Sequence, residues 1–215
     1  MRELSVPGAA ATASLHGEGQ TIVVLGHGAG GNRKNAMLVA LANALAGSGR
    51  AALLYNFPYA EARAGRPDPP ALLEATTRAA AALAREASGA RRVVHGGRSM
   101  GGRIASQVVA QGEPADGLVF LGYPLHPPGQ FEKRREAHLP QIAAPMLFLQ
   151  GTRDAFARAD LLDALMARLG ATAELHRVEH ADHSFGVLKR SGRSPADVLE
   201  EVRSTLLGWL ERRGL

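Results

Sequence analysis

Ser99 lies at the centre of residues 97–101, which read Gly-Arg-Ser-Met-Gly and fit the pattern G-x-S-x-G. A short apolar run at residues 92–94 precedes this segment, and a helical pattern at residues 104–110 follows it. A serine on a sharp turn between a strand and a helix has its hydroxyl exposed above the sheet, where it can act as a nucleophile. Glycine on both sides removes the Cβ atoms that would clash in such a turn. The segment and its context together predict a nucleophilic serine.

Asp154 and His183 could complete the chemistry that a serine nucleophile needs. Asp154 follows the apolar run 145–150, and His183 follows the run 173–178. Because ligands bind at the carboxyl ends of parallel strands, we expect these residues near Ser99. Histidine titrates near neutrality and can take and return the serine proton, while a carboxylate fixes the tautomer of the ring. The competing interpretation of Asp154 is a helix N-cap.

The elements that must position these residues alternate along the chain. The predicted strands span residues 21–25, 50–57, 92–96, 117–122, 145–150 and 173–178. The predicted helices span residues 35–46, 69–87, 104–110, 161–169 and 195–212. This alternation is typical of an α/β fold, a three-layer α/β/α sandwich with a mostly parallel sheet. Residues 123–144 are rich in proline and too few for a large lid, so we expect a minimal cap or none, on a single domain spanning residues 1–215.

The composition excludes several classes of function. The net charge is +5, but the basic residues are scattered among acidic ones and only 5% of residues are aromatic, so no nucleic-acid partner is predicted. The absence of cysteine excludes disulfides, thiolate metal sites and a cysteine nucleophile. No window approaches the roughly 18 apolar residues of a membrane span, and the first residues lack the apolar core of a signal peptide. We therefore expect a cytoplasmic protein without a membrane partner; the oligomeric state is not predicted.

Two other motifs in the sequence bear on cofactor binding. Residues 26–31 fit the dinucleotide fingerprint G-x-G-x-x-G, which also needs an acidic residue at the end of the next strand. That strand ends in Tyr-Asn-Phe at residues 55–57, which argues against a dinucleotide. His180 and His183 are too closely spaced for a metal site and lack further ligands. The expectation is no cofactor and no metal.

Four segments together resemble the α/β-hydrolases. They are Gly-Gly-Arg-Ser-Met-Gly-Gly-Arg at 96–103, Gly-His-Gly-Ala-Gly-Gly at 26–31, Gly-Thr-Arg-Asp at 151–154 and Ala-Asp-His-Ser-Phe at 181–185. The similarity is greatest to the small, cap-poor branch related to dienelactone hydrolases, and it extends to the hydrolase-like domain of some animal chromatin-regulator subunits. Dienelactone hydrolases use a cysteine nucleophile, so a serine at position 99 argues against a dienelactone substrate.

The resemblance implies roles for particular residues. Ser99, Asp154 and His183 stand in the chain order of a hydrolase triad, and the family pattern favours His183 over His180 as the base. The backbone N–H groups of Ala29 and Met100 would form the oxyanion hole. The implied activity is that of a serine hydrolase, which cleaves an ester or a similar bond. The only partner implied is the small acyl substrate. The alternative is a catalytically silent fold that serves as a protein-interaction module.

Further residues could contact a substrate, namely Arg98, His27 and Tyr123. Arg98 and Arg103 flank the serine, and a guanidinium group binds a carboxylate in bidentate fashion. The other interpretation of these arginines, which we favour, is an intramolecular ion pair that supports the site. His27 has two interpretations as well, because it could instead hold the oxyanion turn in place.

Overall fold

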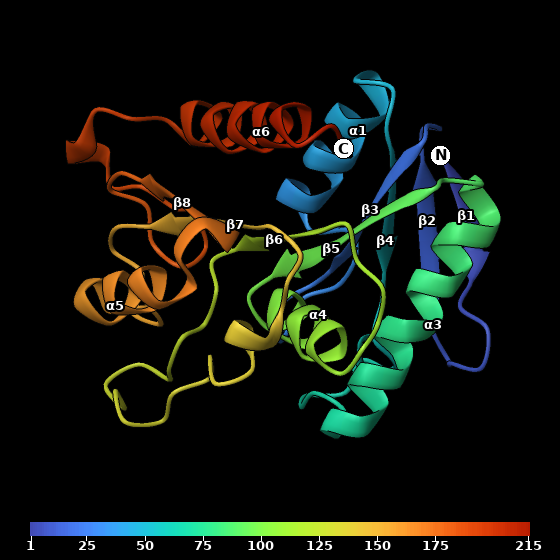
Figure 1. The fold of residues 1–215 in the computed structure, drawn as a ribbon, viewed down its shortest axis with the longest axis horizontal. Coiled ribbons are helices and arrows are strands. Elements are labelled where there is room, and N and C mark those ends of the chain that lie inside the picture. Colours follow the sequence, from blue (N-terminus) through green and yellow to red (C-terminus); the bar gives the residue numbers. More distant parts are fainter.

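A twisted eight-stranded sheet separates two layers of helices in the computed structural model, which describes residues 1–215 (Figure 1). The strands are β1 (Arg2–Ser5), β2 (Thr12–His16), β3 (Thr21–Gly26), β4 (Ala51–Tyr55), β5 (Arg92–Arg98), β6 (Gly117–Leu121), β7 (Met146–Gly151) and β8 (Ala173–Val178). The helices are α1 (Ala36–Gly47), α2 (Pro58–Glu61), α3 (Pro70–Ser88), α4 (Met100–Ala110), α5 (Ala159–Leu169) and α6 (Pro195–Arg212). Three short 3₁₀ turns are η1 (Leu139–Gln141), η2 (Gly170–Thr172) and η3 (Lys189–Ser191).

The sheet order is β1-β2-β4-β3-β5-β6-β7-β8. The strands from β4 across to β8 run parallel, whereas β1 and β2 pair antiparallel at one edge. Helices α1 and α6 cover one face, and α3, α4 and α5 cover the other (Figure 1). The predicted three-layer sandwich with a mostly parallel sheet is confirmed.

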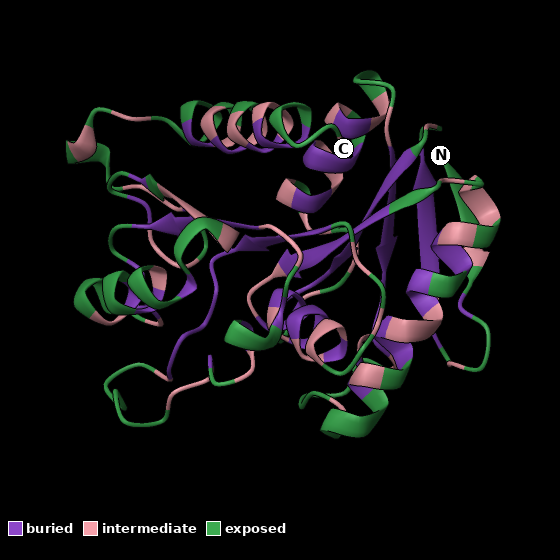
Figure 2. Ribbon diagram, in the orientation of Figure 1, coloured by how far each residue is buried: buried purple, intermediate pink, exposed green.

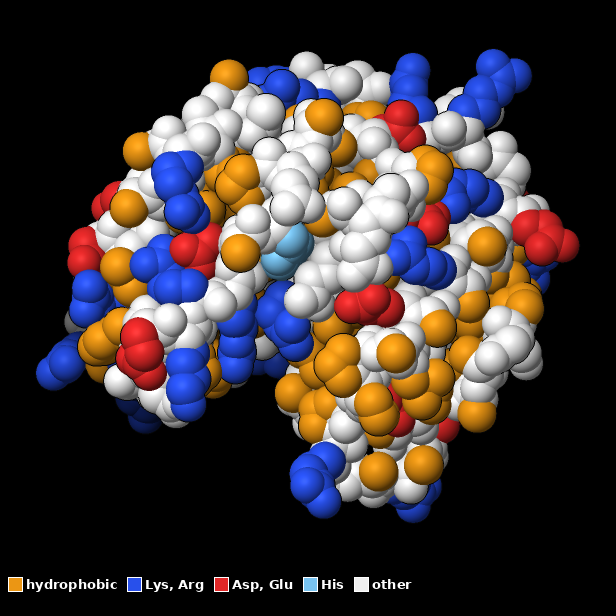
Figure 3. All heavy atoms as spheres, turned by 60° about the horizontal axis from the view of Figure 1, so that its bottom comes forward, with side chains coloured by type: hydrophobic (Ala, Val, Ile, Leu, Met, Phe, Trp, Pro, Cys, Tyr) orange, Lys and Arg blue, Asp and Glu red, His pale blue; other side chains and the backbone are white.

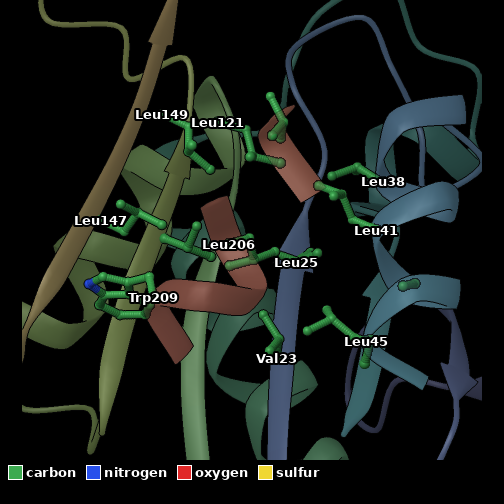
Figure 4. Close-up of a cluster of buried hydrophobic side chains, with 14 of the residues drawn as sticks. Val23, Leu25, Leu38, Leu41, Leu45, Leu121, Leu147, Leu149, Leu206 and Trp209 are labelled. Atoms are coloured by element: carbon green, nitrogen blue, oxygen red, sulfur yellow. The ribbon is translucent and has the colours of Figure 1, made fainter. Parts of the chain in front are cut away.

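The central strands are buried on both faces, which explains their continuous apolar sequences. In β3, Val23 and Leu25 pack toward α1 and α6, while Ile22 and Val24 pack toward α3. Figure 4 shows the first of these clusters, in which Trp209 of α6 lies against the sheet. Exposed residues lie on the outer sides of the helices and in the loops (Figure 2).

The sequence patterns missed β1, β2 and α2. The β2 segment Thr-Ala-Ser-Leu-His has little apolar character, and it becomes a strand because residues 13–16 pair with residues 52–55 of β4. The helix after Ser99 also begins earlier than predicted, at Met100 rather than at residue 104. Gly101 and Gly102 weaken the helical pattern in the sequence, because glycine has a low helix propensity.

The carboxyl ends of the parallel strands lack a helical cap. The chain between β6 and η1 (residues 122–138) contains no helix, in agreement with the predicted minimal cap. None of the six α-helices combines the length and the apolarity that crossing a bilayer requires.

His95 should make the stability of the fold depend on pH. Its ring on β5 is fully buried, and this burial lowers its pKa from 6.5 to about 4 against the opposing charge of Glu113. Between these values the unfolded chain binds a proton that the folded protein does not, so the free energy of unfolding falls as the pH falls. His95→Gln should flatten this dependence by about 1.4 kcal/mol per pH unit.

Denaturant titrations above pH 6.5, and at steps between 6.5 and about 4, would measure this slope. The exposed His180 provides the control variant His180→Gln, which should keep the slope of the wild type. Equal slopes for His95→Gln and the wild type would show that His95 does not carry the effect.

Candidate active site

Ser99 occupies the sharp turn between β5 and α4. Its φ of 50° and ψ of −115° lie in a sparsely populated region that costs about 1–3 kcal/mol for a residue with a side chain. Neighbouring hydrogen bonds hold this conformation: the Ser99 N–H donates to the Leu121 carbonyl at 3.0 Å, and the Arg103 N–H donates to the Ser99 carbonyl at 3.1 Å. The turn therefore fixes the Ser99 hydroxyl at the carboxyl edge of the sheet.

Two glycines permit this turn to pack against the end of β3. A Cβ atom on Gly97 or on Gly101 would lie 2.2 Å from the carbonyl oxygen of Gly26. Gly97 also has a φ of 146°, which side chains rarely allow. The prediction that glycine is needed on both sides of the serine is confirmed.

Ser99, His183 and Asp154 form a continuous chain of hydrogen bonds. The His183 Nε2 atom lies 2.8 Å from the Ser99 Oγ atom, and the His183 Nδ1 atom lies 2.7 Å from the Asp154 Oδ2 atom. The Asp154 side chain is fully buried and the His183 side chain is 17% exposed. An ionised carboxylate only accepts, so Nδ1 carries the proton and Nε2 is left to accept the serine hydroxyl proton. Loops after β5, β7 and β8 supply the three residues.

Asp154 is held by two further donors. Its Oδ2 atom also accepts a hydrogen bond from the side-chain amide of Gln150, which in turn accepts the Tyr123 N–H at 2.8 Å. Its Oδ1 atom accepts the Phe156 N–H at 2.7 Å, so the carboxylate shapes the loop and also bonds His183. The motifs in the sequence do not point to Gln150, although a polar residue in an apolar run is a usable signal.

The loop that carries His183 is shaped by Asp182. The Asp182 Oδ1 atom accepts the N–H groups of Ser184 and Gly186 at 2.8 and 2.9 Å. The ring of Phe156 stacks on the His183 imidazole with centroids 4.2 Å apart, a contact with no clear signal in the sequence. His180 is exposed, and its N–H donates to Thr152. The structure thus brings His183, not His180, to the serine.

Ala29 and Met100 line the same cavity as Ser99, and their backbone N–H groups have no acceptor in the protein. Met100 is the first residue of α4, where the N–H has no partner within the helix. Ala29 follows Gly28, whose carbonyl accepts hydrogen bonds from His27 Nδ1 at 2.9 Å and Tyr59 Oη at 3.2 Å. Because a trans peptide directs its C=O and N–H to opposite sides, this anchoring turns the Ala29 N–H away from His27, and Ala29 lines the cavity together with Ser99.

His27 has a structural role in this turn. Its Nε2 atom accepts the Phe57 N–H at 3.1 Å, so its proton sits on Nδ1 and is donated to Gly28. Burial lowers the pKa of His27, which keeps the ring neutral near pH 7. Tyr123 is also buried, its ring against Phe120 and its hydroxyl donating to the Arg135 carbonyl at 2.7 Å. The predicted substrate contacts through the side chains of His27 and Tyr123 are wrong, because neither side chain reaches the cavity.

Arg98 and Arg103 both line the cavity, and neither has a carboxylate within ion-pair distance. The favoured prediction of intramolecular ion pairs is therefore wrong. Arg98 instead donates from Nη2 to the Ser184 hydroxyl at 2.8 Å and passes close to Gly28, so it braces the turn against the His183 loop. Burial lowers the pKa of Arg98, opposed by the more distant charges of Asp182 and Asp154.

The cavity above Ser99 has a volume of about 590 Å³. Figure 3 shows a hollow on this face, with Lys and Arg side chains on one side of it and hydrophobic side chains on the other. A larger cavity of about 700 Å³ lies at the opposite edge of the sheet, where Gly17, Glu18 and Ala46 contribute to its lining. That cavity contains no histidine, so the one above Ser99 is the candidate active site.

The fold and the turn define a class of protein. A mostly parallel sheet covered by helices on both faces, with a serine on a strained strand-to-helix turn, is the architecture of α/β hydrolases. Residues 19–211 match the family described as alpha/beta hydrolase domain, and the chain belongs to that family.

Solved structures of similar fold cover nearly the whole chain. An alpha-beta serine hydrolase homologue from Coxiella burnetii is 20% identical with a TM-score of 0.74, covering 95% of this chain and 96% of its own. A dienelactone hydrolase from Anabaena variabilis is 21% identical with a TM-score of 0.74, covering 98% and 95%. A serine hydrolase without a lid from Xanthomonas campestris is 19% identical with a TM-score of 0.74, covering 98% and 94%. At these identities the similarity establishes the fold.

Gly101→Ala should destabilise the protein, because its Cβ would collide with the Gly26 backbone. We expect a loss of about 1–3 kcal/mol in the free energy of unfolding, as for other overpacked sites. Gly208 in α6 provides a matched control, since a Cβ there meets only the flexible end of Arg212 at 3.5 Å. Gly208→Ala should stabilise the helix by about 0.5–1 kcal/mol. Urea titrations would measure both, and equal effects of the two variants would contradict the packing argument.

Proposed function

We propose that the protein is a serine hydrolase that cleaves an ester or a similar small acyl substrate through an acyl-enzyme intermediate. The observation that carries this proposal is the chain from Ser99 Oγ to His183 Nε2 at 2.8 Å, and from His183 Nδ1 to the buried Asp154 at 2.7 Å. The family and its serine hydrolase relatives support the same reaction class. A cavity of about 590 Å³ without a helical cap fits small or exposed acyl groups.

In the proposed acylation step, Ser99 Oγ attacks the carbonyl carbon while His183 Nε2 accepts the hydroxyl proton. Asp154 stays ionised and stabilises the imidazolium that forms. The tetrahedral oxyanion accepts hydrogen bonds from the N–H groups of Ala29 and Met100, and donors of this kind are each worth about 2.7–4 kcal/mol. The intermediate then collapses, and the leaving group departs with the proton from His183.

Deacylation repeats these events with water as the nucleophile. Water gives a proton to His183 Nε2 as its oxygen attacks the acyl carbon, and the same two N–H groups receive the second oxyanion. Collapse breaks the bond to Ser99 Oγ, which recovers its proton from His183. The carboxylic acid product then leaves. Side chains, backbone N–H groups and water supply every group that the two steps need.

A fluorophosphonate probe tests the proposal directly, because it reacts with activated serines. We expect labelling of the folded wild type and none of Ser99→Ala or of heat-denatured protein. Ser106 provides a control, since it lies in α4, the helix that follows Ser99, is buried and bonds His138. Ser106→Ala should still be labelled at Ser99. Failure to label the folded wild type would favour the alternative of a silent interaction module.

His27→Leu tests the proposed oxyanion hole. The variant removes one of the donors that anchor the Gly28 carbonyl, and with it part of the orientation of the Ala29 N–H. Complete loss of such a donor costs about 100- to 1000-fold in kcat, so partial loss of its orientation should lower kcat about tenfold and change KM little. Steady-state kinetics on a short ester would measure both constants. A raised KM with an unchanged kcat would instead indicate a role in substrate binding.

A further inference from the structure

Arg103 and Arg135 are two cationic side chains that the proposed chemistry does not use. Arg103 projects from the first turn of α4, and Arg135 comes from the loop between β6 and η1, and both line the cavity of Ser99. Neither guanidinium has a carboxylate within ion-pair distance. This differs from Arg134, the neighbour of Arg135, which pairs with the buried Glu136 at 2.6 Å.

The charge on Arg103 is poorly compensated. Its Nε atom is buried and has no hydrogen-bond partner, and its only side-chain hydrogen bond runs from Nη1 to Gln107 at 3.2 Å. Burial and the like charge of Arg135 lower the pKa of Arg103, opposed at longer range by Glu74. Arg135 itself donates no side-chain hydrogen bond. Burial of a cation without a partner is costly, so an anion between these groups would be strongly favoured.

The other polar groups near Arg103 and Arg135 do not neutralise the positive charge of the two guanidinium groups. His138 bonds Ser106 at 2.7 Å, and burial together with the charge of Arg103 lowers its pKa to about 4, so it is neutral near pH 7. Asp68 also lines the cavity, but its Oδ2 atom accepts the Tyr59 N–H at 3.0 Å. Arg98 lines the same cavity and adds a third positive charge.

We infer that Arg103 and Arg135 form an anion subsite beside Ser99, so that the acyl substrate carries a carboxylate. Guanidinium groups bind carboxylates in bidentate geometry, which suits a pair that lacks such partners. The Arg103 N–H donates to the Ser99 carbonyl at 3.1 Å, so Arg103 stands one turn into α4 from Ser99, at a short spacing, and both residues line the same cavity. A half-ester of a short dicarboxylic acid has its charge a few bonds from its ester carbonyl and fits this spacing. This inference rests on the proposed function of Ser99.

The kinetic test compares monoethyl glutarate with ethyl pentanoate, a neutral ester of similar length, by following acid release. We expect the wild type to prefer the anionic ester in kcat/KM. Arg103→Gln with Arg135→Gln should lower kcat/KM for monoethyl glutarate about 10- to 100-fold, the range for loss of hydrogen bonds to a charged group, and leave ethyl pentanoate within about twofold. Lys133→Gln is the control, because it removes one exposed charge from the same loop outside the cavity. Fluorophosphonate labelling would verify that each variant is folded.

A binding test separates this inference from the proposed hydrolysis. Calorimetry would measure the affinity of the Ser99→Ala variant for glutarate, with and without the two arginine substitutions. Neutral glutaramide would be the control ligand. Glutarate binding that is lost with the arginines supports the subsite, even if no ester is turned over and the hydrolase proposal fails. The inference is overturned if glutarate does not bind, or if the wild type hydrolyses ethyl pentanoate as well as it does monoethyl glutarate.

Discussion

The site depends on one close approach, that of the β5–α4 turn to the end of β3. A Cβ atom on Gly97 or Gly101 would overlap the Gly26 carbonyl. Because glycine has no Cβ, the turn can pack directly against the end of β3. At this turn Ser99 has its strained backbone conformation, α4 starts directly after it at Met100, and the Met100 N–H has no partner within the helix. β3 and β5 are parallel neighbours that are buried on both faces, so their positions are fixed by packing. The position of the Ser99 turn at their carboxyl ends follows from that packing.

The loops around this turn are held by polar contacts that point away from the cavity. The Gly28 carbonyl is anchored by His27 and Tyr59, and Asp154 is anchored by Gln150 and the Phe156 N–H. Such contacts fix the groups that face the cavity without occupying it. A preorganised site of this kind needs little rearrangement when charge develops, which is the main source of electrostatic catalysis in hydrolases.

The two cavity arginines, Arg103 and Arg135, lack the polar partners that hold the loops around the turn. The loop that carries Arg135 also carries Glu136, but this carboxylate pairs with Arg134 and Arg168 rather than with the cavity side chains. Arg103 is half-buried with an unsatisfied Nε atom, and a buried polar group without a partner costs stability. An unsatisfied buried polar group calls for an explanation, and the proposed anion subsite supplies one for Arg103.

The sequence alone determined the alternating strands and helices, the glycines around Ser99, and the order of Ser99, Asp154 and His183 at strand ends. These signals can be read from the sequence, because each element is recognised from its own local pattern and the order of the elements is the order of the chain. Only the tertiary structure decided the pairing of β1 and β2, the burial of His27 and Tyr123, and the absence of ion pairs at Arg98 and Arg103. It also brought Gln150, Phe156 and Arg135 to the site. Such contacts join residues far apart in the chain, so the identity and spacing of nearby residues cannot specify them.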